Sequence, residues 1–361
     1  MSKLFTPIRV RDVEFRNRVW IAPMCMYMAE NRDGVVGGFH LAHHSKFALG
    51  GAGLIIAEAT AVSPEGRISP WCPGLWNSEQ TEAWGAVVSL VHQLGGKIGI
   101  QLAHAGRKGS TNRGWPGYAP GTVAIADGGW QTVSSTDEAF PGYDAPRLLT
   151  TDEVAELVSK FAAAAKRAKH AGFDCVEVHA AHGYLLHEFL SPLTNSRTDI
   201  YGGSPENRAR FLVEVVAAIR AEVGADYPVL VRVSATDWHP DGLTQEATAQ
   251  ALKWAKAAGA DVFDVSTGGL VAGVTIPVAP GYQVPVAEYI ASHSGDPVSA
   301  VGLITTGNQA EEILQAGEIA VISIGRAALR DPFWPMRAAA ELGERPEYWH
   351  PAYDRGWFPS A

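Results

Sequence analysis

The stretch CVEVHAAHGYLLHEFLSPLTNSRTDIYGGSPENRARF, residues 175–211, is the part of the chain from which the fold can be predicted. It opens with a largely apolar run, residues 175–178, that predicts a buried strand, and His179, His182 and Tyr184 follow directly. In parallel α/β proteins the catalytic groups gather at the carboxyl ends of the strands. Two imidazoles three residues apart can direct N–H groups at one small target, and Tyr184 adds a phenolic donor. The stretch therefore predicts a site that holds an oxygen atom and protonates a neighbouring carbon.

A histidine pair at this spacing has two other interpretations. Each imidazole could be a structural histidine with satisfied hydrogen bonds, or the pair could be half of a metal site. His187 and Glu188 follow, but no H-E-x-x-H pattern completes a zinc site, and we predict no bound metal. A metal-dependent hydrolase that uses His179 and His182 as ligands stays an alternative.

Strands and helices alternate on both sides of this stretch. Apolar runs predict eight parallel strands that are buried on both faces, at residues 19–22, 54–59, 97–101, 175–178, 229–234, 262–266, 298–301 and 319–324. Helices are expected between them, at residues 37–53, 79–94, 151–171, 205–223, 245–258, 285–293 and 309–315. Because the alternation is regular, we expect residues 1–361 to form a single α/β domain, a (β/α)8 TIM barrel.

Two segments depart from this alternation. Residues 4–18 alternate around Arg11 and Asp12, which predicts an N-terminal β-hairpin. Residues 109–147 are rich in Gly, Pro, Ser and Trp without a clear period. They indicate a long structureless loop after the third strand, which we expect on the active-site face.

Composition restricts the partners and the compartment. The 361 residues carry a net charge of −9, which argues against nucleic acid or an anionic membrane as a partner. The three cysteines form no CxxC motif, so a disulfide framework or an iron–sulfur cluster is not expected. The N-terminus has no apolar signal core, and no run has the length of a membrane helix. We therefore expect a cytoplasmic protein.

Glycines after the last two strands predict a phosphate site independently of the histidines. Barrels commonly bind phosphate with the loops after strands seven and eight and the start of a short helix. Here the seventh strand leads to Gly302 and Gly307, and the eighth leads to Gly325 and Arg326. The glycines could simply end strands, but Arg326 adds a guanidinium that suits an anion. Arg232, inside an apolar strand, is a further cation that needs a buried partner.

The run HAAHGYLLHEFLSPLTNSRTD, followed by YGGS, ENR and RF, resembles the Old Yellow Enzyme family of flavin-dependent ene-reductases. The Pro23-Met24-Cys25-x-Tyr27 pattern is similar to the bacterial branch typified by YqjM and xenobiotic reductase A. Fungal and plant relatives generally carry Thr where this branch carries Cys. The resemblance implies a hairpin that plugs the bottom of the barrel, bound FMN, and NADPH or NADH as the co-substrate.

The resemblance also assigns residues to the flavin. The phosphate would lie at Gly325 and Arg326, beside the loop from Gly302 to Gly307, and Arg232 would lie at the N1–O2 edge of the ring, where negative charge grows on reduction. The other flavin-binding residues would be Ala22, Pro23, Met24, Cys25, Ala59 and Gln101. The Cys25 thiol would be a weak donor that tunes the reduction potential, with an inert buried thiol as the alternative.

For the substrate, the resemblance implies that His179 and His182 hold the activating oxygen and that Tyr184 protonates the α-carbon. Tyr27 would contact the substrate, and Lys108 aligns with a basic residue at the pocket edge to which we give no catalytic role. The expected activity is ping-pong reduction of alkenes activated by a carbonyl or nitro group. A flavin-binding barrel without turnover is a further alternative.

The C-terminal tail, residues 353–361, carries Arg355 and Trp357. In the similar branch this tail crosses a two-fold interface and completes the neighbour's active site, and Arg and aromatic residues are common interface anchors. We therefore expect a homodimer, or a tetramer of such dimers, in which both residues border the partner's substrate pocket. The alternative is that Trp357 folds back on its own barrel.

Overall fold

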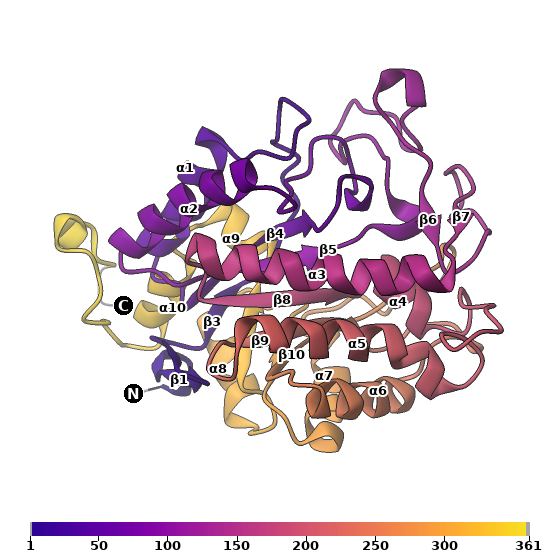
Figure 1. Cartoon of the computed structure of the whole chain (residues 1–361). Helices are drawn as coiled ribbons and strands as arrows, with labels where there is room; N and C mark the ends of the chain where they lie inside the picture. Colours follow the sequence, from indigo (N-terminus) through magenta and orange to yellow (C-terminus); the bar gives the residue numbers. More distant parts are fainter. Residues whose placement is uncertain (1, 359–361) are drawn as a thin grey trace.

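The structure, a computed structural model, describes residues 2–358 (Figure 1). Eight parallel strands form a closed barrel in the order β10-β11-β12-β3-β4-β5-β8-β9. These strands are β3 (Val19–Ile21), β4 (Leu54–Ala61), β5 (Ile98–Ala103), β8 (Cys175–Ala180), β9 (Val229–Ser234), β10 (Val262–Ser266), β11 (Val298–Ala300) and β12 (Val321–Ile324). The predicted (β/α)8 barrel is confirmed. The last strand begins two residues later than predicted, and β8 extends two residues further, so that it includes His179.

Helices cover the outside of the barrel (Figure 1). The expected ones are α1 (Gly38–Leu49), α2 (Ser78–Gln93), α3 (Thr151–Ala171), α5 (Pro205–Val223), α6 (Gln245–Ala257), α7 (Val284–Ser294) and α8 (Gly307–Gln315). Three short helices were not predicted: α4 (Leu185–Leu190), α9 (Arg326–Arg330) and α10 (Trp334–Glu341). The described part of the chain also contains five 3-10 helices: η1 (Lys3–Phe5), η2 (Pro64–Gly66), η3 (Gly106–Lys108), η4 (Ile125–Asp127) and η5 (Pro351–Gly356). Within residues 2–358 none of the helices is both long and apolar enough to cross a bilayer.

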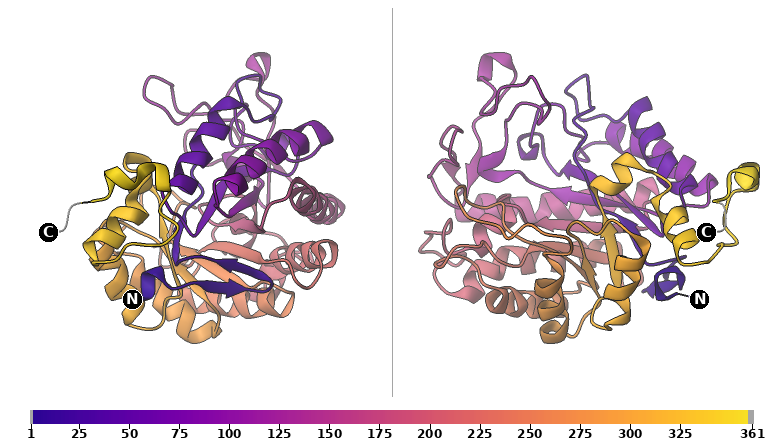
Figure 2. Two further views of the ribbon diagram at one scale, coloured as in Figure 1. Left: turned by 90° about the vertical axis from the view of Figure 1, so that its left-hand side faces the viewer. Right: turned by 180° about the vertical axis from the view of Figure 1, so that it is seen from behind.

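The N-terminal hairpin closes the bottom of the barrel. Its strands, β1 (Ile8–Val10) and β2 (Val13–Phe15), pair antiparallel and lie across one end of the barrel (Figure 2, left). The Phe15 ring lies 5.1 Å from Trp20 of β3 and belongs to an apolar cluster with Leu230 and Val262, at the starts of β9 and β10. The plug that the resemblance implied is therefore present, and it leaves the carboxyl ends of the strands as the open end.

The interior of the barrel changes from apolar to polar toward the open end. Side chains alternate along a strand, so every second residue points inward. From the plugged end upward, the inward residues are Cys175, Glu177 and His179 on β8, Leu230, Arg232 and Ser234 on β9, and Val262, Asp264 and Ser266 on β10. The charged residues thus form a buried layer between the apolar plug and the histidines.

The long segment 109–147 is not structureless, contrary to our prediction. It contains η4 and two short parallel strands, β6 (Val133–Ser134) and β7 (Arg147–Leu148), which lie at the end of the molecule opposite both termini (Figure 1). The Arg113 guanidinium lies 4.6 Å from the Trp71 ring and 4.5 Å from the Trp115 ring, and it pairs with Glu30. These contacts order a segment in which no periodic pattern is visible, because they join residues far apart in the sequence.

Candidate active site

His179, His182 and Tyr184 come together at the open end of the barrel. The two imidazole rings meet edge to face with centroids 5.4 Å apart, and the Tyr184 ring lies 5.0 Å from His179. Burial lowers the pKa of both imidazoles well below the usual value, and the neighbouring Arg232 adds to the effect. Both rings are therefore neutral near pH 7, and each can donate one hydrogen bond at most.

The hydrogen bonds of the two rings assign their protons. His179 Nδ1 accepts a hydrogen bond from the Ala181 N–H at 3.3 Å, so its ring proton lies on Nε2. His182 Nε2 lies 2.8 Å from Ser266 Oγ, and that hydroxyl donates to Gln283 Oε1 at 3.2 Å, so His182 Nε2 is the donor to Ser266. Within residues 2–358 nothing accepts the N–H of His179, whereas His182 must exchange Ser266 for a ligand before it can donate.

Lys108 holds the backbone that carries His182. Its ammonium donates to the carbonyl oxygens of His182 at 2.8 Å and Gly269 at 2.9 Å, and it lies 5.1 Å from the Tyr184 ring centroid. His182 adopts a left-handed conformation with φ 58°, and its N–H donates to Ser234 Oγ at 2.9 Å. Burial lowers the pKa of Lys108 to about 8. Lys108 therefore positions the histidine, a role that the sequence did not reveal.

Cys25 and Tyr27 lie on the same side as Tyr184, packed on a small apolar cluster that includes Ala59. Burial raises the pKa of the Cys25 thiol well above the usual value, so it is a neutral thiol rather than a nucleophile. Tyr27 has a left-handed backbone with φ 57°. Tyr27, Lys108 and Tyr184 line a cavity of about 450 Å³, and the long loop supplies its other wall with Arg113, Trp115, Tyr118 and Tyr143.

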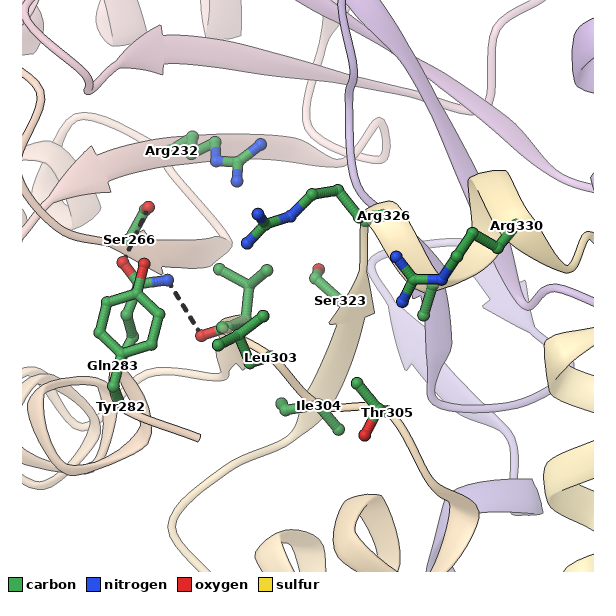
Figure 3. A pocket seen from close by; sticks show the side chains of 14 residues that line it. Arg232, Ser266, Tyr282, Gln283, Leu303, Ile304, Thr305, Ser323, Arg326 and Arg330 are labelled. Carbon is green, nitrogen blue, oxygen red and sulfur yellow. Dashed lines mark hydrogen bonds between the residues drawn. The ribbon is translucent and has the colours of Figure 1, made fainter. Parts of the chain in front are cut away.

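Three arginines line a second cavity, of about 190 Å³ (Figure 3). Arg232 reaches it from β9, and Arg326 and Arg330 reach it from α9. Gly302 and Gly325 line it as well, and Gly302 has a φ of 128°, which side chains rarely allow. The first N–H groups of a helix lack intrahelical acceptors, so the start of α9 adds donors to the cationic side chains. The cavity is suited to an anion such as phosphate.

Gly307 is not brought to this cavity. Its N–H donates to Glu341 Oε2 at 2.7 Å, and a Cβ at Gly307 would lie 2.8 Å from the Ala338 carbonyl oxygen. This glycine instead permits the close packing of α8 on α10. Arg330, which we did not predict, lines the cavity. Its spacing of four residues from Arg326 on one helix is the signal that could have found it.

The segment Ala22 to Cys25, which was predicted to contact the flavin ring, connects these two groups. The Ala22 N–H donates to the Ile324 oxygen of β12 at 3.1 Å, and a Cβ at Gly325 would lie 3.8 Å from Met24 Sδ. Pro23 and Met24 therefore run from the arginine cavity toward Cys25. A cationic recess, a mostly apolar wall and neutral donors follow in that order. This spatial arrangement fits a ligand with a phosphate at one end and a flat ring at the other, as in FMN.

Arg355 and Trp357 do not join this site within the chain. They lie in and after η5, at the end of the molecule where both termini lie (Figures 1 and 2). The Trp357 ring packs 5.3 Å from the Trp349 ring, and Arg345 lies 5.4 Å from the Trp357 ring centroid. Arg355 itself is exposed.

Comparisons with known proteins agree with this geometry. A model of the NADH:flavin oxidoreductase / NADH oxidase family matches residues 3–345. The chain is 48% identical over 359 residues to the NADPH dehydrogenase of Listeria monocytogenes, covering 99% of this chain and 100% of the relative. It is 46% identical over 356 residues to the NADPH dehydrogenase of Geobacillus thermodenitrificans, covering 98% of each. Morphinone reductase superposes with a TM-score of 0.79 at 29% identity, over 100% of this chain and 96% of that one. The chain therefore belongs to the NADH:flavin oxidoreductase / NADH oxidase family and is an FMN-dependent, nicotinamide-oxidising enzyme of the Old Yellow Enzyme type.

Proposed function

We propose that the enzyme reduces carbon–carbon double bonds that are activated by a carbonyl or nitro group, with NADPH as the electron donor. One observation carries the proposal: the Nε2–H of His179 and the hydroxyl-bearing ring of Tyr184 lie together at the barrel mouth, and His179 is the register neighbour of Arg232, which lines the arginine cavity. A neutral donor can stabilise the oxyanion that develops when an activated alkene accepts hydride. The choice of NADPH rests on the names of the two curated relatives.

The chain's own residues have distinct parts in this proposal. Bound FMN supplies hydride transfer, from the nicotinamide and then to the β-carbon of the alkene. Arg326 and Arg330 hold the phosphate of the cofactor. His179 and, after it leaves Ser266, His182 donate to the activating oxygen. The Tyr184 hydroxyl protonates the α-carbon, and burial keeps its pKa well above the usual value, so that it carries a proton at neutral pH.

Stopped-flow kinetics of the two half-reactions test these parts. Tyr184→Phe should slow reoxidation of the reduced enzyme by cyclohexenone about 10²–10⁴-fold, because a positioned acid contributes that much. Reduction by NADPH should change little. Tyr201→Phe is a matched control, since Tyr201 is also a buried tyrosine whose hydroxyl donates a hydrogen bond, to Glu214 Oε2 at 2.8 Å. Equal slowing of both half-reactions in Tyr184→Phe would remove this residue from the donor role.

The two alternative functions are a metal-dependent hydrolase and a flavin-binding barrel without turnover, and they make different predictions. Among the residues that the structure describes, no group of three or more His, Cys, Asp or Glu side chains could hold a metal ion, and the family is one of flavin oxidoreductases, so the hydrolase is disfavoured. A flavin-binding barrel without turnover would bleach with NADPH but would not be reoxidised anaerobically by any of a panel of enones, maleimides and nitroalkenes.

We also propose that the tail acts in a homodimer. Arg355 is exposed, and Tyr353 is 40% exposed in the same short helix. An arginine beside an exposed tyrosine suits an interface. Placement of Arg355 and Trp357 at the partner's substrate pocket, the cytoplasmic location and the single-domain organisation stay predictions.

A further inference from the structure

The buried layer beneath the histidines contains more negative than positive groups. Glu177 is 0% exposed and Asp264 is 1% exposed. Arg232, on the strand between them, pairs with Asp264 at 3.1 Å, and Gln101 Nε2 donates to Glu177 Oε1 at 2.7 Å. The other titratable groups on the inward face of β8 are the Cys175 thiol below and the neutral His179 above. One guanidinium therefore faces two carboxyl groups.

Several oxygen atoms of this layer have no hydrogen-bond partner among the described residues. They are Glu177 Oε2 and both oxygens of Asp264, of which Oδ2 has the ion pair with Arg232 Nε at 3.1 Å but no aligned hydrogen bond. Buried polar atoms are nearly always satisfied, and a second carboxylate without a cation would leave an uncompensated charge in the interior. A proton held by the two carboxyl groups removes the extra charge and supplies one missing donor. Like-charged carboxyl groups at one site commonly share a proton in this way.

We propose that Glu177 and Asp264 hold one proton between them, and that this pair, acting through Arg232, couples the flavin's reduction potential to pH. The coupling rests on the proposed position of Arg232 at the flavin ring, whereas the shared proton does not. Burial and the neighbouring Asp264 raise the pKa of Glu177 to about 8, which agrees with a proton on Glu177 at neutral pH.

The direction of the coupling follows from charge. Reduction by hydride adds negative charge beside Arg232, and this charge makes the carboxyl pair hold its proton more tightly. Below about pH 8 both redox states keep the proton, so reduction takes up none at the pair. Above about pH 8 the oxidised enzyme has lost the proton, and reduction draws one proton from solvent onto Glu177. The carboxyl pair therefore acts on the flavin through Arg232, by gaining or losing a proton, and is not a catalytic group.

Spectroelectrochemical titration of the holoenzyme between pH 6 and 10 tests the coupling. We expect the slope of the midpoint potential against pH to double above about pH 8, because two protons instead of one accompany the two electrons. Glu177→Gln, which keeps the shape of the protonated side chain, should restore a single slope. A wild-type slope that stays single across this range, or a doubled slope that survives in Glu177→Gln, overturns the coupling.

Infrared difference spectroscopy tests the shared proton independently of turnover. The difference between the wild-type and Glu177→Gln spectra at pH 7, in which the contribution of Glu188 cancels, should contain a protonated-carboxyl band of Glu177. This band should be lost in Asp264→Asn, because Glu177 then becomes the sole anionic partner of Arg232 and ionises. A band that persists in Asp264→Asn, or that is already absent from the wild type, overturns the proposal.

A matched control is Glu188→Gln. Glu188 is another buried carboxyl, and it accepts hydrogen bonds from the Arg107 N–H and Ser134 Oγ. This variant should change the infrared spectrum, since burial raises the pKa of Glu188 to about 7, while the potential keeps its wild-type dependence on pH. A change of that dependence would place the coupling outside the Glu177–Asp264 pair. Enone kinetics of the wild-type enzyme test the proposed function separately. Enone reduction with a single potential slope would overturn the coupling alone, whereas absence of enone reduction would overturn the proposed function.

Discussion

Replacement of Lys108 by Met should weaken the binding of phenols to the oxidised holoenzyme while FMN stays bound. The unbranched side chain is shorter by one atom and loses two charge-assisted hydrogen bonds, to the carbonyl oxygens of His182 and Gly269. Without them the left-handed backbone of His182 keeps its N–H bond to Ser234, and its ring keeps the bond to Ser266 only until a ligand replaces it. The His182 imidazole, which donates to the ligand oxygen, then loses its fixed orientation.

The magnitude follows from the two bonds. Each hydrogen bond to a charged group contributes about 1.5–3 kcal/mol. The bond to the His182 oxygen acts on a ligand-binding residue, whereas the bond to Gly269 orders the neighbouring loop. We therefore expect the binding free energy to fall by the equivalent of one such bond. Since each 1.4 kcal/mol is tenfold, the Kd should increase about tenfold to 150-fold.

Titration with a para-substituted phenol, followed through the long-wavelength charge-transfer band of the flavin, measures this Kd. Lys169→Met is a matched control, because Lys169 also donates to a backbone oxygen, that of Val223 at 2.7 Å, and lies 5.9 Å from the Tyr227 ring centroid. It should leave phenol binding unchanged. An unaltered Kd in Lys108→Met, or an equal loss in Lys169→Met, would refute the positioning role of Lys108.

Three further predictions concern the cofactor, acid stability and the tail. Arg330→Ala should weaken FMN binding about tenfold, or ~1.4 kcal/mol, since its side chain lines the arginine cavity but is exposed; fluorescence of released FMN measures this, and Arg337→Ala on α10 is the control. Burial lowers the pKa of His43 and of His104 from 6.5 to about 4, so the unfolded chain binds protons first. Stability is then full above pH 6.5 and falls as the pH drops through about 4, by up to about 3 kcal/mol for each group. Urea unfolding should show a smaller fall for His43→Gln. Truncation from Arg355 onward should raise the KM for enones and weaken the dimer without FMN loss; sedimentation showing an unchanged oligomer with unchanged kinetics would contradict the interface.

The barrel was predictable because its strands are buried on both faces and therefore appear as continuous apolar runs. The histidines and Tyr184 were predictable as a group for a related reason. They follow one strand directly, and no long-range contact is needed to bring them together. The arginine cavity was predictable in part, because Gly325 and Arg326 directly follow the last strand.

The residues that were missed depend on contacts between distant segments. Lys108 meets His182 and Gly269 only after the barrel has closed, and Ser266 reaches His182 from another strand. Gly307 was assigned to the phosphate because its loop is glycine-rich, yet packing on Ala338 explains it. The ordering of residues 109–147 likewise comes from Arg113 stacking on Trp71, a pairing that no local pattern reveals.

Backbone strain at the site has the same long-range origin. Tyr27, His182 and Leu303 have φ values of 57°, 58° and 52°, and all three lie in the loops at the open end of the barrel. Each such residue costs about 1–3 kcal/mol and persists only where surrounding contacts hold it. The Met26 N–H, next to Tyr27, donates to the buried Glu58 Oε2 at 2.7 Å, so Glu58 holds the backbone beside Tyr27. Lys108 and Ser234 hold the backbone of His182 in the same way. Because the holding side chains belong to β4, η3 and β9 rather than to the strained loops, their loss should relax the site while the barrel stays folded.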